Sequence, residues 1–196
     1  MLRAFLLLVL VLFSASSPAF AHPHLFVDNK LTFMFDESGL AGMLVEWKFD
    51  DMYSSGIIYD FDNGDGVFSK QENALLKRDN FSNLKKYDFF LEVVIDSSPF
   101  KVVFVQDFEA SINNGRLVYR FFVPCHVSAG QHTKTIHVGV VDETNFVAIT
   151  TQKEDVLLQK AEPLYRTELA FTPTSEFLQI LSPNAIDRVA LKFWKP

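Results

Sequence analysis

The sequence predicts an α+β fold in which β-strands dominate, an antiparallel β-sandwich with a helix-loop-helix segment inserted near its start. Three observations support this fold class. Apolar and polar residues alternate over residues 25–35, as in a strand with one buried face. Between about residues 50 and 87, apolar residues follow a helical spacing instead. Short apolar runs separated by turn residues return after residue 88.

The first two strands are expected to form a hairpin. In residues 25–35 most odd-numbered positions are apolar, and in residues 43–49 Met, Val, Trp and Phe share one face. The intervening Asp-Glu-Ser-Gly at residues 36–39 is a turn sequence, because these residues accept tight backbone conformations. Such a short connection favours antiparallel pairing of the two strands.

The inserted segment carries its own helix signals. Three apolar residues between 52 and 58 suit a short helix, and residues 60–66 form a loop rich in Gly and Asp. Ser69 followed three residues later by Glu72 is a capping box, which marks a helix start. The spacing predicts that this helix runs over residues 70–87.

The remaining chain is predicted to be β-structure. The candidate strands are residues 89–95, 101–108, 116–124, 133–141 and 145–152, with further candidates at 156–158, 164–171 and 186–194. Asn113-Asn114-Gly115 marks a hairpin turn between two of them. Because no repeat or low-complexity linker interrupts the chain, residues 22–196 are expected to form one β-rich domain.

The first 21 residues have the three-part pattern of a secretory signal. Arg3 supplies the positive charge, residues 5–13 the apolar run, and Ala19-Phe20-Ala21 the small-x-small pattern that signal peptidase recognises. The apolar run is too short to span a bilayer. We therefore expect cleavage after Ala21 and a periplasmic protein that starts at His22, with no membrane span left.

The composition argues against several classes of function. The formal net charge is −6 and no basic stripe is present, so nucleic acid is not an expected partner. Cys125 is the only cysteine, which excludes an internal disulfide. The sequence has no Gly-x-Ser-x-Gly, His-Glu-x-x-His or phosphate-binding loop. We therefore do not expect an enzyme.

The strongest candidate site is the new amino terminus, His22-Pro23-His24. A terminal histidine offers two nitrogens to one metal ion, its α-amine and its ring Nδ1, and His24 adds a third. The α-amine loses its proton easily, because its pKa is near ~8. Three nitrogens suit Ni, Co, Zn or Cu. Pro23 has no amide hydrogen, which blocks the copper/nickel site built from deprotonated backbone amides. The alternative is that two histidines merely follow a cleavage site.

A four-coordinate metal ion needs a further donor from solvent or protein. Asp142 is the first candidate, because it ends the predicted strand 133–141 and can lie at the rim of the sandwich. Capping a turn is the commoner role for such an aspartate. His137, on the outward face of the same strand, is the reserve candidate. His126 and His132 are expected to be polar surface residues.

Residues 60–72 resemble an EF-hand calcium loop. With Gly66 as the sharp-turn glycine, Asn63, Asp65 and Glu72 occupy ligand positions three, five and twelve.

Position one of that loop departs from the pattern. It is Phe61, which cannot bind a cation, although Asp60 and Asp62 flank it. The segment is therefore either a shortened calcium site that starts at Asp62 or a relic kept for its turn and helix cap.

The order of these motifs resembles the domain of unknown function 1007 (DUF1007) family. The motifs are His22-Pro23-His24 after a signal, Trp-Lys-Phe-Asp-Asp at residues 47–51, the loop at residues 60–72, and Val-Val-Asp-Glu-Thr-Asn-Phe at residues 140–146. The likeness spans most of residues 22–150. Glu143 departs from the pattern, because the family is expected to have proline there.

The resemblance implies a compartment and metal handling, and no reaction. Members are periplasmic proteins of similar length, and many look to be encoded beside nickel/cobalt-type or zinc-linked transporters. The first hypothesis is therefore an accessory protein that captures a divalent transition metal and passes it to a membrane transporter. Two alternatives are a copper-dependent oxidative enzyme of the histidine-brace type and a calcium-stabilised adhesion or scaffold module without a transition metal.

Overall fold

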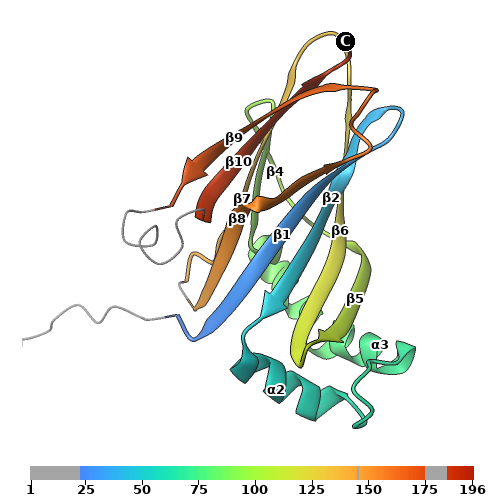
Figure 1. Cartoon of the computed structure of the whole chain (residues 1–196), viewed down its shortest axis with the longest axis vertical. Helices are drawn as coiled ribbons and strands as arrows, with labels where there is room; N and C mark the ends of the chain where they lie inside the picture. The colour runs from blue at the N-terminus through green and yellow to red at the C-terminus, as the bar shows by residue number, and fades with distance from the viewer. Residues whose placement is uncertain (1–22, 145, 175–184) are drawn as a thin grey trace, which may run out of the picture.

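The computed structural model describes residues 23–144, 146–174 and 185–196, and Figure 1 shows their arrangement. His22 of the predicted metal site lies outside the described residues. The elements, in chain order, are β1 (Leu25–Phe35), β2 (Gly39–Phe49), α2 (Asp51–Phe61), α3 (Lys70–Asp79), η1 (Phe81–Phe90), β3 (Leu91–Ile95), β4 (Ser98–Phe100), β5 (Gln106–Asn113), β6 (Arg116–Ser128), β7 (Lys134–Val140), β8 (Val147–Gln159), β9 (Arg166–Pro173) and β10 (Ala185–Trp194).

The strands form one curled, mixed sheet rather than the two antiparallel sheets of the predicted sandwich (Figure 1). The strand order is β4-β3-β7-β10-β8-β1-β2-β6-β5, and β9 adds to β10. β1 pairs parallel with β8, whereas the other described strand pairs are antiparallel. Strand alternation predicted the faces of the strands correctly, but it carries no information about which strands pair.

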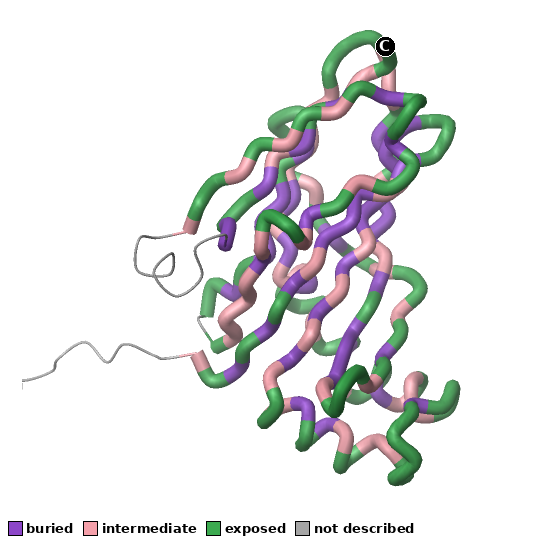
Figure 2. Tube along the Cα trace, viewed as in Figure 1, coloured by how far each residue is buried: buried purple, intermediate pink, exposed green. Residues whose placement is uncertain are grey.

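β1 and β2 form the predicted hairpin, and their inward residues make the centre of the core. Phe33 and Met43 are register partners and are fully buried. Trp47 packs edge-on against Phe121 of β6, with ring centroids 5.0 Å apart. Figure 2 shows this buried stripe running along β1, β2 and β6. Burying these aromatic and aliphatic side chains supplies the main driving force for folding.

The inserted helices start where the sequence predicts. The Asp50 side chain accepts from the Tyr53 amide and caps α2, and Ser69 with Glu72 forms the predicted capping box of α3. Within the described residues, neither these helices nor η1 is long and apolar enough to cross a membrane.

The predicted continuous helix over residues 70–87 is wrong. α3 ends at Asp79, and a 3-10 segment, η1, follows it. Asn80 sits at the break, where its side-chain oxygen accepts hydrogen bonds from the hydroxyls of Tyr53 and Tyr119. Phe81 then turns into the core and stacks on Phe108. Tertiary contacts therefore override the helical spacing at this point.

Several predicted strands also differ in extent. The strand predicted at residues 89–95 starts only at Leu91, and the one predicted at residues 116–124 continues to Ser128. Residues 101–105 are not in a strand, and β5 covers residues 106–113 instead. Its register with β6 is set by the predicted hairpin turn, in which Asn114 and Gly115 both have positive φ. β8 is longer than expected, because it combines the candidates 145–152 and 156–158.

A buried polar contact joins β1 to β8. Asn29 is 1% exposed, and its side-chain amide donates to the Thr151 hydroxyl at 2.8 Å. These two residues are also register partners in the parallel pair. A buried amide without a partner is strongly unfavourable, so this contact favours the observed register over a shifted one.

Replacing Thr151 by valine is expected to lower the free energy of unfolding by roughly 1–3 kcal/mol, because the Asn29 amide loses its acceptor. Urea denaturation measures this change. Thr150→Val, on the neighbouring and less buried position, is the matched control and should shift stability by less than about 0.5 kcal/mol. Equal effects of the two substitutions would contradict the role given to this contact.

Candidate functional site

The amino-terminal histidine pair leads directly into β1, and the structure fixes the position of its second member. The His24 amide donates to the Phe146 carbonyl at 2.9 Å, which extends the β1–β8 pairing by one residue. The His24 ring lies 5.4 Å from the Phe146 ring in a tilted arrangement. Its side chain is exposed. The ring nitrogens of His24 are therefore presented to solvent from a backbone that is held in place.

Asp142 lies in the same loop that contacts His24, just after β7. Its carboxylate accepts hydrogen bonds from the amide and hydroxyl of Thr144 at 2.9 and 2.7 Å, and from the Val147 amide at 2.9 Å. Asp142 thus caps this turn, which is the commoner of the two roles considered from the sequence. Because a carboxylate offers about four acceptor positions, few remain for a metal ion.

The charge of Asp142 is maintained despite its burial. Asp142 is 6% exposed, and burial alone would raise the pKa of its carboxyl. The hydrogen bonds from Thr144, Val147 and Phe146 together outweigh burial and hold this pKa below its ordinary value of 3.8. The loop is therefore fixed by an ionised aspartate at neutral pH.

The structure thus brings His24 and Asp142 to one rim of the sheet. Among the described residues, no three His, Cys, Asp or Glu side chains lie close enough together to hold a metal ion. A metal site at this rim would therefore need His22, which lies outside the described residues.

The other candidate histidines lie elsewhere. His137 is exposed on β7, as predicted, but β10 and β8 separate that strand from β1 in the sheet order. His126 lies on β6 beside the 36–39 turn, and His132 follows β6. Both are at the opposite end of β1 from His24.

Asp50 is a residue of this rim that the site prediction missed. Its carboxylate accepts from the Phe26 amide and the Tyr53 amide, both at 2.8 Å, and so ties α2 to the start of β1. Burial opposes its charge, but these hydrogen bonds and nearby Arg116 hold its pKa below the ordinary value. The Trp-Lys-Phe-Asp-Asp motif was the available signal, since it placed an aspartate directly after β2.

Cys125, the single cysteine, lies away from the rim and has a structural environment. It is partly buried on β6. Burial raises the pKa of its thiol to about 11, so little thiolate is present at neutral pH.

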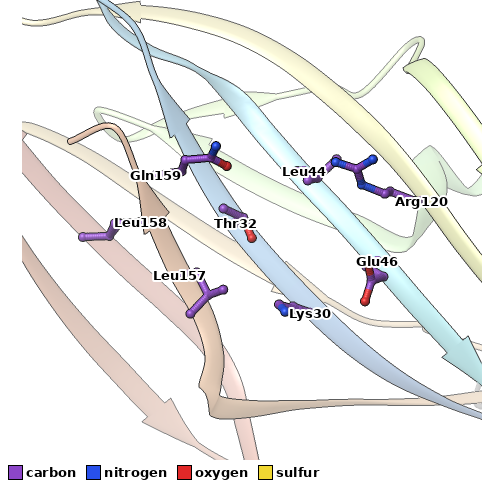
Figure 3. Close-up of a pocket in the computed structure, with 8 residues that line it drawn as sticks. All are labelled: Lys30, Thr32, Leu44, Glu46, Arg120, Leu157, Leu158 and Gln159. Carbon is purple, nitrogen blue, oxygen red and sulfur yellow. The ribbon is translucent and has the colours of Figure 1, made fainter.

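One of the cavities at the surface of the sheet adjoins the rim. This cavity of about 270 Å³ is lined by residues of η1, β3 and the 141–144 segment, including Asp142 and Tyr87. Another, of about 530 Å³, is a groove over β1, β2 and β8. Figure 3 shows Lys30, Glu46 and Arg120 on one side of this groove and Leu157 and Leu158 on the other. None of its lining residues is a predicted metal ligand.

The calcium-like loop connects α2 to α3 and is folded by its own side chains. Asp62 Oδ2 accepts from the amides of Gly64 and Gly66 at 3.2 and 3.1 Å. Asn63 accepts from the Asp65 amide, and Asp65 accepts from the Val67 amide.

Glu72 closes the loop from the start of α3. Its carboxylate accepts from the Asn63 amide at 3.0 Å and from the Ser69 amide at 2.7 Å. The side-chain and backbone hydrogen bonds with Ser69 lower the pKa of Glu72. Gly66 has a φ of +79°, as a sharp-turn glycine requires.

The loop geometry favours Asp62 over Asp60 as its first acidic residue. Asp62 Oδ2 binds the loop backbone, whereas its buried Oδ1 has no hydrogen-bond partner among the described residues. Asp60 is exposed on the last turn of α2. Asp62, Asn63, Asp65 and Glu72 carry oxygen donors of the kind that Ca²⁺ prefers. Their three carboxylates do not lie close enough together in the described structure to hold a cation, so calcium binding would require them to move closer.

The fold and the rim define the class of protein: a β-rich domain with a curled mixed sheet, a helix-loop-helix at one end and an exposed histidine at the start of β1. The chain matches the model of the family described as Protein of unknown function (DUF1007) over residues 6–179, and it belongs to that family.

Two relatives are similar to this chain in sequence. An "Uncharacterized 15.5 kDa protein in trpE 3'region" from Spirochaeta aurantia is 29% identical over 134 residues, which are 68% of this chain and 94% of that protein. An "Uncharacterized protein" from Haemophilus influenzae is 27% identical over 133 residues, 66% of this chain and 63% of that protein. The likeness to the Haemophilus protein thus leaves over a third of that longer chain unmatched.

Asp142→Asn is expected to destabilise the protein by roughly 1–3 kcal/mol at pH 7, because one acceptor oxygen becomes an N–H donor that faces other donors. The contribution of the carboxylate is present above the ordinary pKa of 3.8 and is lost as pH falls through the lower folded-state value. The difference between variant and wild type should therefore shrink in acid. Chemical denaturation from pH 7 downward measures it, with exposed Glu143→Gln as control. A difference independent of pH would contradict this account.

If the loop binds calcium, millimolar Ca²⁺ should raise the melting temperature through mass action. Asp62→Ala and Asp65→Ala should each abolish the rise, because each removes a proposed ligand, whereas Asp60→Ala should retain it. Calorimetry with and without Ca²⁺ measures the shift. An unchanged melting temperature in the wild type would support the relic interpretation, and loss of the shift in Asp60→Ala would contradict the assignment of Asp62.

Proposed function

We propose that this protein is a periplasmic accessory protein that captures a divalent transition metal at its mature amino terminus and passes it to a membrane transporter. The observation that carries the proposal is the position of His24. Its backbone is held by Phe146 while its ring remains exposed, so it can join His22 in binding one ion.

The donor set proposed for capture is small and open. The α-amine and ring of His22 with the ring of His24 supply three nitrogens, and a fourth position is left to solvent or a protein oxygen. Nickel, cobalt, zinc and copper all accept nitrogen donors of this kind. An open position suits transfer, because a ligand from the receiving protein can enter before the first ligands leave.

The surroundings of His24 support a role for Asp142 in fixing the site. Asp142 orders the loop that holds Phe146, and Phe146 in turn contacts His24. Most acceptor positions of Asp142 are already taken by hydrogen bonds, which leaves little capacity for direct ligation. We therefore propose that Asp142 acts mainly by positioning His24. Direct ligation of the metal by Asp142 is the alternative, and metal-binding measurements on Asp142→Asn test it.

The two other hypotheses receive weaker support from the geometry. A histidine-brace copper enzyme needs a second histidine from a distant part of the sequence beside the first, and His126, His132 and His137 lie away from this rim in the described structure. A calcium-stabilised scaffold module is supported by the oxygen donors of the loop at residues 62–72. That loop and the histidine pair are separate, so a calcium site is compatible with the metal-capture proposal.

His24→Ala is expected to weaken binding of Ni, Co, Zn or Cu by at least about tenfold, which is ~1.4 kcal/mol, because the ion loses a chelating nitrogen. One residue added before His22 should be nearly as damaging, since it removes the α-amine from the chelate. Binding should also weaken as pH falls, because the ligand nitrogens must be unprotonated. Isothermal titration calorimetry on the protein starting at His22 measures all three effects.

His126→Ala is the matched control and should bind as the wild type does. Mass spectrometry of periplasmic material should show a chain starting at His22. A mature chain with residues before His22, or unchanged affinity in the extended protein, would overturn the amino-terminal mechanism.

A further inference from the structure

The outward side of α2 carries large apolar side chains that the fold does not cover. Met52 is 76% exposed and Tyr59 is 87% exposed, and both lie on one stripe of the helix, seven residues apart. Ser54 and Ile57 on the inward side are buried. α2 is therefore apolar on two sides, and only the inward side packs on the protein. A helix needs just one apolar side to attach to its own core.

Gly56 lies on the exposed stripe between Met52 and Tyr59. A Cβ atom at Gly56 would meet no atom within 4 Å, so packing within the chain does not require glycine. Its backbone is helical, so no positive φ requires glycine either. Glycine inside a helix is nevertheless destabilising relative to alanine. A missing side chain here allows another chain to approach the helix backbone closely. We call Met52, Gly56 and Tyr59 the α2 face.

The surroundings of the α2 face are acidic. From Asp50 to Phe68 the chain contains five aspartates and no lysine or arginine. Arg116, from β6, reaches Asp51 at 3.3 Å and also lies near Asp50, whereas Asp60, Asp62 and Asp65 lie at the end of α2 and in the following loop. Two such faces would repel each other, and an anionic lipid surface would repel either one. A basic partner is favoured by the same charges.

We propose that the α2 face is a docking surface for a basic segment of another protein that anchors apolar side chains on Met52 and Tyr59. Exposed tyrosine in a patch with apolar neighbours is typical of residues that contribute strongly to binding. The face starts beside the candidate metal terminus, because the Asp50 cap of α2 binds the Phe26 amide, two residues after His24. That the partner also receives metal rests on the proposed function, whereas the docking itself does not.

The test uses the protein starting at His22, in EDTA, and a fluorescent amphipathic helical peptide of lysine and leucine as the probe. Fluorescence anisotropy should show saturable binding that weakens with salt. The double variant Met52→Ser/Tyr59→Ser should bind at least about tenfold more weakly. Gly56→Gln should also weaken binding although it raises the melting temperature, since glutamine is the better helix former. If Gly56→Gln lost binding because it unfolds, its peptide affinity and its melting temperature would both fall.

The matched control is Leu157→Ser/Leu164→Ser, which removes two exposed apolar side chains away from α2 and should leave binding unchanged. His24→Ala should also retain peptide binding, so failure of the metal site and failure of docking are distinguishable. Equal binding by wild type and Met52→Ser/Tyr59→Ser would overturn the proposal, as would equal binding of a glutamate and leucine peptide. If the protein forms a dimer that Tyr59→Ser abolishes, the partner is a second copy of this chain and the proposal is wrong. If it binds anionic vesicles but not the peptide, the partner is a membrane and the proposal is also wrong.

Discussion

The parallel pairing of β1 with β8 is the interaction on which the rest of the molecule depends. It joins Asn29 to Thr151, 122 residues apart in the chain, and inserts the hairpin of β1 and β2 between the late strands and β6. The sheet is therefore mixed and curled instead of separating into two antiparallel sheets. The same pairing continues to His24 and Phe146, and thereby decides which loop lies beside the amino terminus.

One end of the molecule consequently collects the features that support a function. The pairing places His24 against the loop that Asp142 caps, and the Asp50 carboxylate ties the start of α2 to Phe26. Ionised aspartates build both connections through backbone hydrogen bonds, so they order this end without filling it with apolar residues. The exposed residues at this end include His24, Phe26, Phe146 and those on the outward side of α2. Metal capture and partner docking would then take place on adjoining surfaces.

The segment between α2 and α3 retains the helix-loop-helix arrangement, although its first acidic residue is one position later than the EF-hand pattern requires. Ser69 caps α3, Gly66 has a positive φ, and the Glu72 carboxylate closes the loop by accepting a hydrogen bond from the Asn63 amide. In the EF-hand pattern Phe61 would occupy position one, which cannot accept hydrogen bonds through its side chain. Here Asp62, one residue later, accepts from the amides of Gly64 and Gly66. The network of Tyr53, Asn80 and Tyr119 fixes both helices to β6.

The sequence by itself determined the local features: the faces of β1 and β2, the capping box at Ser69, the hairpin turn at Asn114 and the family. These follow from side-chain periodicity and from backbone preferences within a few residues. It could not determine that β1 pairs with β8, that the helix breaks at Asn80, or that Asp50 joins the rim. Each of these depends on contacts between distant residues, whose pairing is selected by the packing of the whole core. Only the tertiary structure decided that His24, and not His137, lies beside Asp142's loop, because that neighbourhood is set by strand order.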